Sequence, residues 1–435
     1  MNIIAYPSAA AESRIKKITS RAFDFSKKDL EYVDRILSDV RRNGDEALVK
    51  YTRKFDAPKM TVKNLKTGTG EFDRAAKQVK KPVLRAIQRA ARQIESFHSQ
   101  QKQQSWIDTH RPGTMLGQLV SPVGAVGIYA PGGKGGRTPL VSSVLMGAIP
   151  AKVAGVERIV LVTPPTKTGN IDTNLLVAAK RAGIKEVYKV GGPWAIAALA
   201  YGTDTIPRVD VIVGPGNQYV TLAKKLLFGT VGIDMIAGPS EILVIADASA
   251  DPGFVAADLL SQSEHDVMSS AILVTDSGDV AKAVAAAIKG QVEKLPRKEI
   301  ARESLRRFGG IFTTRDLAAA AELSNRMAPE HLELQVEAPF ELLGSIKNAG
   351  AVFLGHYTPE PVGDYIAGPN HVLPTAGTAR FSSALSVDNF VKKTSLIHYS
   401  EKAFRREAAD IVRLANIEGL TAHAESVGWR LKGRK

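Results

Sequence analysis

Three histidines of this chain stand beside carboxylate or amide side chains, in clusters that suit metal binding or acid–base chemistry. The chain has eight histidines in all. Imidazole changes its protonation near neutral pH and is a common metal ligand, so polar clusters around it are candidate functional sites. The three clusters are Gln262-Ser-Glu-His265, Glu330-His331 and Glu418-Gly-Leu-Thr-Ala-His423.

Gln262 and His265 are candidates for binding one metal ion together. They are three residues apart at the end of a predicted helix, so both side chains can point to one side. A metal site needs further ligands, and Asp364 and His423 are suitable oxygen and nitrogen donors. Spacing does not prove that they converge. The alternative is that Asp364 caps a turn after Gly363 and that His423 is an exposed helical residue.

The chain contains no cysteine. This excludes disulfide bonds, thiolate zinc sites and catalysis by a thiol. A zinc site in this chain would therefore use nitrogen and oxygen ligands only.

Two glycine clusters raise the question of a nucleotide. Gly132 to Gly136 lacks the spacing of a Walker loop, and Gly214-Pro-Gly-Asn217 lacks the third glycine of the dinucleotide fingerprint. The second cluster nevertheless follows a predicted strand and opens a helix, where backbone N–H groups favour a phosphate. The position suits a nucleotide without identifying one.

The elements that must position these residues alternate between short apolar strands and helices. This alternation after Ser121 predicts an α/β fold with parallel sheets. It occurs in two series, which indicates two α/β units. The predicted strands are Val123 to Ala130, Arg158 to Thr163, Glu186 to Val190 and Val209 to Val213, then Ile242 to Ala246, Ala271 to Thr275, Ile311 to Thr313 and Ala351 to Leu354.

The remaining segments are helices and one long loop. Ser26 to Phe55 reads as a helix with Ser26 as its cap, and a second helix from Pro82 places His98 on a packed apolar stripe. Gly355 to Ala384 is long for a structureless connection, which favours a functional loop. Beyond Ser400 the chain becomes helical and basic.

Composition sets the class of protein. With 435 residues, 44% hydrophobic and 23% charged, the chain is expected to fold as a globular protein of more than one domain. The net charge of +14 is spread over many segments without an aromatic-interleaved block, so we expect a basic surface and no nucleic-acid partner. Without a signal sequence or a membrane span, a cytoplasmic location is expected.

Five longer motifs follow one another over nearly the whole chain. They are Val126-Gly-Ile-Tyr129-Ala-Pro-Gly-Gly133, Gly214-Pro-Gly-Asn217, Asp234-Met-Ile-Ala-Gly-Pro-Ser240-Glu-Ile-Leu, Ala328-Pro-Glu-His331 and Pro361-Val-Gly-Asp364-Tyr-Ile-Ala-Gly-Pro-Asn-His371-Val-Leu-Pro-Thr375. Motifs of this length are specific, and together they resemble the histidinol dehydrogenase family.

The resemblance implies roles for individual residues. Glu330 and His331 would be the acid–base pair, and NAD contacts would fall on Tyr129 and Asn217. Trp194 stands where the family often has a cofactor-contacting glutamine, so the chain departs from the family at this NAD contact. The resemblance further implies zinc held by Gln262, His265, Asp364 and His423, and substrate contacts from Ser240, His331, His371 and Glu418 together with those four ligands.

The resemblance also implies the architecture. We expect two incomplete Rossmann-like domains, one inserted in the other, with small helical arms that intertwine two subunits and share their active sites. The expected ranges are 1–28 for the N-terminal arm, 29–128 with 241–385 for the first domain, 129–240 for the second domain on the NAD side, and 386–435 for the C-terminal arm.

The implied reaction fits these residue types. L-Histidinol carries an imidazole and an amine, which zinc can bind without taking part in electron transfer. His331 would accept the alcohol proton as hydride leaves for NAD, and Glu330 would activate water to hydrate the aldehyde for a second oxidation to L-histidine.

Three alternatives remain at this stage. A paralogous zinc- and NAD-dependent dehydrogenase would act on another small polar alcohol, but the retained His371 and Glu418 argue against it. A zinc hydrolase would not need the phosphate-type turn at Gly214 to Asn217. A basic nucleic-acid-binding module would bind with a steep salt dependence.

Overall fold

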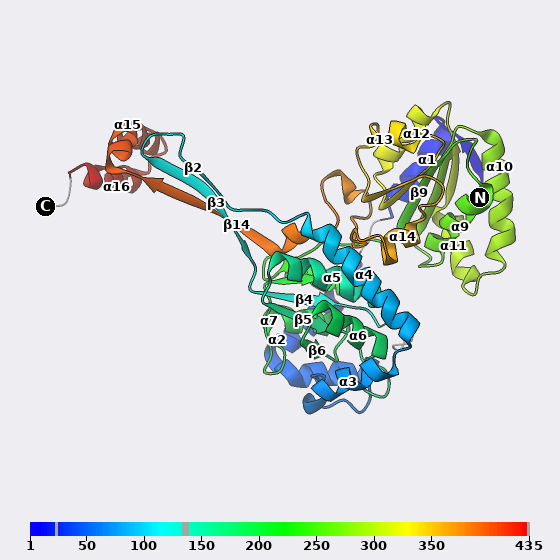
Figure 1. The fold of residues 1–435 in the computed structure, drawn as a ribbon, viewed down its shortest axis with the longest axis horizontal. Coiled ribbons are helices and arrows are strands. Elements are labelled where there is room, and N and C mark those ends of the chain that lie inside the picture. Colours follow the sequence, from blue (N-terminus) through cyan, green and yellow to red (C-terminus); the bar gives the residue numbers. More distant parts are fainter. Residues whose placement is uncertain (22–24, 133–138, 433–435) are drawn as a thin grey trace. The chain divides into compact units, whose positions relative to one another are not determined.

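The computed structural model describes residues 1–21, 25–132 and 139–432. Most of the glycine cluster Gly132 to Gly136 lies outside the described residues. The chain divides into two compact units, Met1–Gln101 with Val123–Phe390, and Lys102–Pro122 with Val391–Lys435. The larger unit holds two parallel sheets, and the smaller unit holds an antiparallel sheet (Figure 1).

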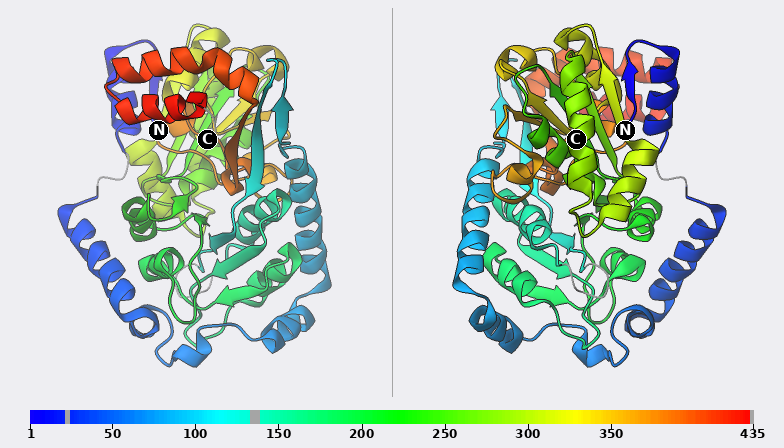
Figure 2. Two further views of the ribbon diagram at one scale, coloured as in Figure 1. Left: turned by 90° about the vertical axis from the view of Figure 1, so that its left-hand side faces the viewer. Right: turned by 90° about the vertical axis from the view of Figure 1, so that its right-hand side faces the viewer.

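The first sheet of the larger unit has six parallel strands in the order β1-β11-β10-β9-β12-β13. Every residue of β9 and β10 is buried, as expected for strands covered on both faces. Strand β1, at the N-terminal end, joins the edge of this sheet by pairing with β11 (Figure 2). The strands are β1 (Ile3–Ala5), β9 (Glu241–Ala246), β10 (Ser270–Thr275), β11 (Gly310–Thr313), β12 (His331–Gln335) and β13 (Ala351–Leu354).

Helices cover both faces of this sheet. One apolar core contains residues of α9, α10 and α11, and the other contains residues of α1 and α12. The short helix α14 follows β13 and carries Asp364. The helices are α1 (Ala9–Thr19), α9 (Pro252–Ser263), α10 (Gly278–Val292), α11 (Lys298–Phe308), α12 (Leu317–Met327), α13 (Pro339–Leu343) and α14 (Glu360–Tyr365).

The second sheet has five parallel strands in the order β6-β5-β4-β7-β8. The chain first builds β4, adds β5 and β6 on one side, and then returns to add β7 and β8 on the other. The strand order therefore reverses between β4 and β7, which is where open α/β sheets bind ligands. The strands are β4 (Ala125–Tyr129), β5 (Arg158–Val162), β6 (Glu186–Tyr188), β7 (Val211–Val213) and β8 (Gly232–Ile233).

Two helix layers cover the second sheet. One core contains residues of α2, α7 and α8, and the other contains residues of α3, α4, α5 and α6. Helix α2 begins where Ser26 accepts a hydrogen bond from the backbone of Asp29, as the sequence predicts. The helices are α2 (Lys27–Phe55), α3 (Thr69–Gln78), α4 (Lys81–Ser99), α5 (Val141–Ala154), α6 (Thr173–Ala182), α7 (Gly192–Tyr201) and α8 (Gln218–Leu227).

The smaller unit is a three-stranded antiparallel sheet with two helices. Strand β14 pairs with β3 along nine residues, from Val391 opposite Pro122 to Tyr399 opposite Thr114. Within this unit the guanidinium of Arg111 donates hydrogen bonds to the carboxylate of Glu407. The elements are β2 (Trp106–Asp108), β3 (Thr114–Pro122), β14 (Val391–Tyr399), α15 (Glu401–Ile417) and α16 (Thr421–Lys432).

The structure confirms the α/β class and all eight predicted strands. It also confirms His98 as a packed residue, fully buried and bonded through Nδ1 to the carbonyl of Ile94. The prediction of one long loop from Gly355 to Ala384 is wrong in part, because α14 and a 3-10 helix at Thr378–Arg380 form there. The ranges expected for the arms and domains stay a prediction.

Among the described residues, no helix combines the length and the apolar character that a membrane span requires.

Candidate functional site

The amino ends of β9 and β12 bring the predicted catalytic residues together. These strands pair side by side, with His331 opposite Ile242. Glu241 is the first residue of β9, and His331 is the first residue of β12. Glu330 precedes His331 directly, so the predicted acid–base pair lies at this edge of the six-stranded sheet.

The imidazole of His331 is held in one orientation. Its Nδ1 lies 2.8 Å from the backbone carbonyl of Glu241, so Nδ1–H donates to that oxygen. The other ring nitrogen, Nε2, is buried and has no hydrogen-bond partner among the described residues. Burial lowers the pKa of His331 to about 4, so the ring is neutral near pH 7 and Nε2 can accept a proton.

Glu330 and Glu241 are bonded reciprocally. The backbone N–H of Glu241 donates to Glu330 Oε2 at 2.8 Å, and the N–H of Glu330 donates to Glu241 Oε2 at 3.2 Å. Arg21 compensates the charge of Glu241 through a buried ion pair of 2.7 Å. Among the described residues Glu330 has no lysine or arginine partner, and burial raises its pKa well above the usual value. Its carboxylate is therefore a stronger base than an exposed one.

Helix α14 adds one buried and one half-buried carboxyl group. Glu360 and Asp364 lie one helical turn apart, and burial raises the pKa of Glu360 to about 8 and that of Asp364 to about 6. Nδ1 of His371 lies 3.8 Å from Asp364 Oδ1, and burial lowers the pKa of His371 to about 4. A buried glutamate, Glu333, fixes the start of α14 by accepting a hydrogen bond of 2.8 Å from the N–H of Glu360.

These side chains fit a metal ion. Donor atoms of His331, Glu360 and Asp364 all lie within 4.8 Å of one another. The amide oxygen of Gln262 is buried without a partner among the described residues, while its Nε2 donates to the Glu241 carbonyl. A set of imidazole, carboxylate and amide donors without thiolates suits zinc.

The predicted zinc ligands differ in how deeply they are buried. Gln262 is buried at the end of α9, whereas His265 is exposed just beyond that helix, near enough for its charge to affect the pKa values of His331 and Glu360. His423 lies exposed on α16 in the smaller unit, and so does Glu418 at the end of α15.

The predicted cofactor residues meet at the other sheet. Tyr129, Trp194 and Asn217 line one cavity of about 650 Å³. Tyr129 ends β4 and Asn217 follows β7, so the cavity lies where the strand order reverses. The side chain of Asn217 caps α8 by accepting hydrogen bonds from the N–H groups of Tyr219 and Val220.

The loop before Asn217 is held tightly. Gly214 has φ +120°, and a side chain there would collide with the carbonyl of Tyr129. The carboxylate of Asp234 accepts a hydrogen bond of 2.8 Å from the N–H of Gly214, and Lys224 donates to the Gly214 carbonyl at 3.0 Å. Lys224 and Asp234 also form a buried ion pair. This clamp fixes the phosphate-type turn.

Trp194 packs against a helix and is almost fully buried. Its ring stacks on Phe55 at 5.3 Å and on Tyr51 at 5.7 Å between centroids, and its Nε1 donates to Thr52 Oγ1 at 3.3 Å. The ring has two possible roles, packing in the protein interior and contact with the cofactor, and both would use its faces. Two stacked aromatic neighbours favour packing.

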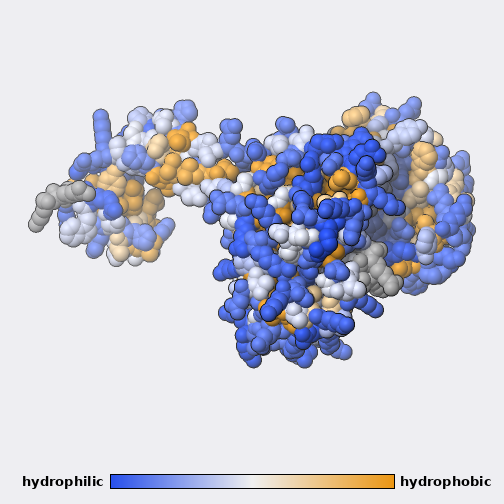
Figure 3. Space-filling model, turned by 60° about the horizontal axis from the view of Figure 1, so that its bottom comes forward, coloured by the Kyte–Doolittle hydropathy of each residue, from blue (hydrophilic) through white to orange (hydrophobic). Residues whose placement is uncertain are grey.

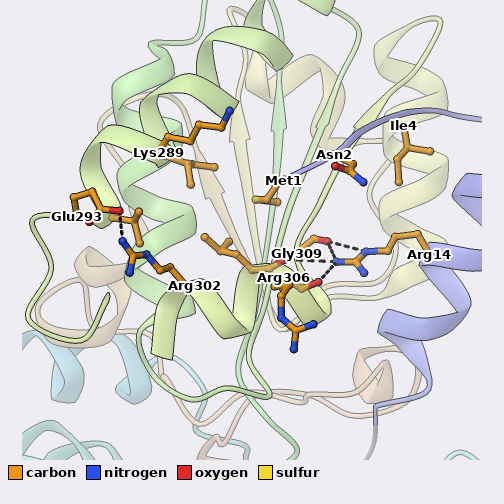
Figure 4. Close-up of a pocket in the computed structure, with 12 residues that line it drawn as sticks. Met1, Asn2, Ile4, Arg14, Lys289, Glu293, Arg302, Arg306 and Gly309 are labelled. Carbon is orange, nitrogen blue, oxygen red and sulfur yellow. Dashed lines mark hydrogen bonds and ion pairs between the residues drawn. The ribbon is translucent and has the colours of Figure 1, made fainter. Parts of the chain in front are cut away.

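A cavity of about 500 Å³ elsewhere in the larger unit is rich in cations but is not a candidate active site (Figure 4). Arg14 donates to the carbonyls of Gly309 at 2.9 Å and Arg306 at 3.2 Å, which end helix α11. Arg302 pairs with Glu293. Arg14 thus ties helix α1 to the end of α11, and Arg302 forms an ion pair at the surface.

Sequence reasoning missed Glu241, Glu360 and Arg21 in the site. Glu241 directly follows the predicted Ser240, and Glu360 stands four residues before Asp364, a spacing that would have pointed to it had a helix been predicted there. No sequence pattern around Arg21 marks it as a site residue, because its partner Glu241 is 220 residues away.

Comparisons with known proteins agree with this geometry. The family model for histidinol dehydrogenase matches residues 20–431. The histidinol dehydrogenase of Desulfotalea psychrophila is 54% identical over 400 residues, which cover 92% of each chain. That of Heliobacterium mobile is 50% identical over 432 residues, covering 99% of this chain and 100% of that one.

A solved structure agrees as well. The crystal structure of histidinol dehydrogenase from Elizabethkingia anophelis superposes with a TM-score of 0.92 at 40% identity, covering 99% of this chain and 98% of that one. Together with the buried pair Glu330 and His331 and the cavity at the reversal of strand order, these matches show that the chain belongs to the histidinol dehydrogenase family of NAD-dependent oxidoreductases.

Proposed function

We propose that this chain oxidises L-histidinol through L-histidinaldehyde to L-histidine with two NAD, the last step of histidine biosynthesis. The observation that carries this proposal is the oriented, neutral imidazole of His331 beside a buried glutamate. Its Nδ1 is bonded to a carbonyl, and its Nε2 is free to take a proton.

The first oxidation depends on His331. An alcohol loses its hydroxyl proton as hydride leaves its carbon, and Nε2 of the neutral ring accepts that proton. The Glu241 carbonyl bonded to Nδ1–H keeps the ring in the required tautomer and stabilises the imidazolium that forms.

The second oxidation depends on Glu330. An aldehyde must gain water before it can lose a second hydride, and a base has to remove a proton from that water. Burial raises the pKa of Glu330, so its deprotonated carboxylate takes up a proton readily. Its backbone bonds with Glu241 hold it beside His331.

The metal we propose is zinc, held by Gln262, His265, Asp364 and His423. A bound zinc ion would act as a Lewis acid that binds the imidazole and the amine of histidinol. The orphaned Gln262 oxygen supports this assignment, and so does Asp364, which has a donor atom within 4.8 Å of donor atoms of His331 and Glu360. Ser240, His371 and Glu418 are proposed to complete the substrate contacts, with His371 already close to Asp364.

The cofactor cavity is proposed to hold NAD against Tyr129 and Asn217. The N-terminal end of α8 follows the clamped Gly214 turn and is suited to a pyrophosphate. Trp194 lines the same cavity from α7.

We further propose that two chains share their active sites in a homodimer. The smaller unit exposes apolar side chains that a single chain does not cover, seen in orange in Figure 3. On α15 these are Ile411, Leu414 and Ile417, the last of them 82% exposed. Such a face, with Glu418 next to it, suits a partner subunit.

The test is the stoichiometry of the reaction. The purified protein is incubated with L-histidinol and NAD, and histidine, free aldehyde and NADH are measured. We expect two NADH and one histidine per histidinol with little aldehyde released, because both oxidations use one site. One NADH per histidinol with accumulating aldehyde would contradict the proposal, and turnover of another alcohol only would favour the paralogous dehydrogenase.

A further inference from the structure

The cavity at the ends of β4 and β7 has one charged side chain among its described lining residues, and that side chain is acidic. It is Asp56, the residue that ends helix α2. The other described lining residues are Tyr32, Phe55, Tyr129, Pro131, Gly132, Pro164, Gly192, Pro193, Trp194, Asn217 and Tyr219. No lysine, arginine or histidine is among them.

The carboxylate of Asp56 has an unused acceptor. Its Oδ2 is buried and has no hydrogen-bond partner among the described residues. A buried carboxylate oxygen without a donor is unfavourable, and burial accordingly raises the pKa of Asp56 to about 6. A ligand that brings hydroxyl donors into the cavity would satisfy this oxygen.

The position of Asp56 matches the ribose end of a dinucleotide. Its charge acts on the hydroxyl of Tyr129, which also accepts a hydrogen bond of 3.2 Å from the N–H of Gly192. Gly192 follows β6 and Pro164 follows β5, and both line the same cavity as Asp56. The phosphate-type turn with Asn217 is on the other side, after β7. In dinucleotide-binding sheets of this type an acidic side chain binds the 2′-hydroxyl of the adenosine ribose.

We propose that Asp56 determines the choice of cofactor: its carboxylate accepts a hydrogen bond from the adenosine ribose of NAD and excludes the 2′-phosphate of NADP. The proposal rests on the proposed binding of NAD in this cavity. A 2′-phosphate would replace the hydroxyl donor by a dianion beside a carboxylate, with no described cation to compensate either charge.

Trp194 holds Asp56 in place. The last turns of α2 carry Tyr51, Thr52 and Phe55, and Trp194 stacks on or bonds to all three. The N–H of Asp56 donates to the carbonyl of Thr52 at 2.9 Å, which ties the acid to the same turn. Trp194 is thus a positioning residue for the carboxylate.

The experiment compares Asp56→Asn with wild type by measuring the dissociation constants of NADH and NADPH from nucleotide fluorescence. We expect wild type to bind NADH far more tightly than NADPH. Asp56→Asn keeps the shape but removes the charge, so it should weaken NADH about tenfold and shift the NADH-to-NADPH ratio at least about tenfold toward NADPH. Wild type that binds both equally, or a variant with an unchanged ratio, would overturn the proposal.

Two control variants separate this proposal from the proposed function. Asp39→Asn removes the same charge from α2 outside the lining of the cavity and should leave both constants unchanged. Asn217→Asp retains a helix-capping oxygen but adds a negative charge at the phosphate-type turn, so it should weaken NADH and NADPH together. If Asn217→Asp weakens both cofactors while Asp56→Asn leaves the ratio unchanged, only the role of Asp56 is overturned. If neither variant affects binding, NAD does not occupy this cavity.

Discussion

Burial acts in opposite directions on the two kinds of titratable side chain that meet at the six-stranded sheet. It lowers the pKa of His331 and His371 to about 4, and it raises the pKa of Glu330, Glu360 and Asp364. Both changes favour the neutral forms, because burial disfavours the charged form of a side chain. A bound divalent cation would instead favour the carboxylates as anions, so this cluster is suited to receive one.

The division of labour between the neighbours can be tested directly. His331→Asn removes the proton acceptor and should depress both oxidations by about a hundredfold or more. Glu330→Gln retains shape and hydrogen bonds but removes the base for water, so it should mainly slow oxidation of supplied histidinaldehyde. Stopped-flow measurement of NADH from each substrate checks this. Equal turnover of the aldehyde by wild type and Glu330→Gln would rule out the role assigned to Glu330.

The unsatisfied carboxylate of Asp56 predicts a pH-dependent stability. Its folded-state pKa of about 6 lies above the unfolded value, so the proton it binds stabilises the fold at low pH and that contribution is lost as the pH rises through 6. Asp56→Asn should therefore raise the free energy of unfolding at pH 8 by about 2–3 kcal/mol, at ~1.4 kcal/mol per pKa unit, and by less at pH 4.5. Urea unfolding of the cofactor-free protein measures both.

Asp39 on the same helix is the matched control with the opposite sign. Hydrogen bonds from Lys50 and Tyr51 hold the pKa of Asp39 down to about 2, so its charge stabilises the fold above the unfolded pKa. Asp39→Asn should lower the stability at pH 8. If both variants shift the unfolding midpoint in the same direction, the account of Asp56 fails.

Individual site residues were predictable only where a local pattern marked them. Glu330, His331 and Gln262 stand in polar clusters and lie in the site. The pairing of Arg21 with Glu241 is set by how two segments pack, and no spacing in the sequence reports it. The same holds for Glu333, whose carboxylate meets the start of α14 across the fold.

At the scale of elements, most of the parallel strands were predictable, whereas β1, β8, β12 and the smaller elements were not. Strands such as β9 consist almost entirely of consecutive apolar residues, and this pattern predicts a buried parallel strand. Strand β12 reads His-Leu-Glu-Leu-Gln, with polar residues that are buried because they belong to the site. Helix α14 has only six residues and contains Gly363, which argues locally against a helix, whereas Pro361 stands in the first turn, where proline is tolerated. Tertiary packing overrides both signals.

Helix α14 can be displaced by one methyl group. A Cβ on Gly363 would lie 2.7 Å from the ring of Phe353, so Gly363→Ala should push the helix away from β13 and shift Glu360 and Asp364. We expect a lower zinc content and a lower kcat, measured by metal analysis and histidinol oxidation. Gly344→Ala is the control, because a Cβ there meets nothing within 4 Å. Full zinc and full activity in Gly363→Ala would show that α14 does not position the ligands.

At the scale of the whole molecule, the smaller unit leaves many of its apolar side chains exposed. Besides the face of α15, it exposes Trp106, Ile107, Ile397 and Trp429, each more than half exposed. A surface of this kind is typical of a subunit interface. The long pairing of β14 with β3 was missed from the sequence because Val391 to Tyr399 carries polar residues on both faces.

The last prediction tests whether two chains build each active site. His331 lies in the larger unit and Glu418 in the smaller one, so a shared site would take His331 from one chain and Glu418 from its partner. His331→Asn and Glu418→Ala chains should each be inactive as homodimers. In a mixed dimer both changes fall in one site, and the other site is intact. Random pairing gives mixed dimers about half the time, so activity should recover to roughly a quarter of wild type. Subunit exchange demonstrated by native mass spectrometry without any recovered activity would mean that Glu418 serves the site of its own chain.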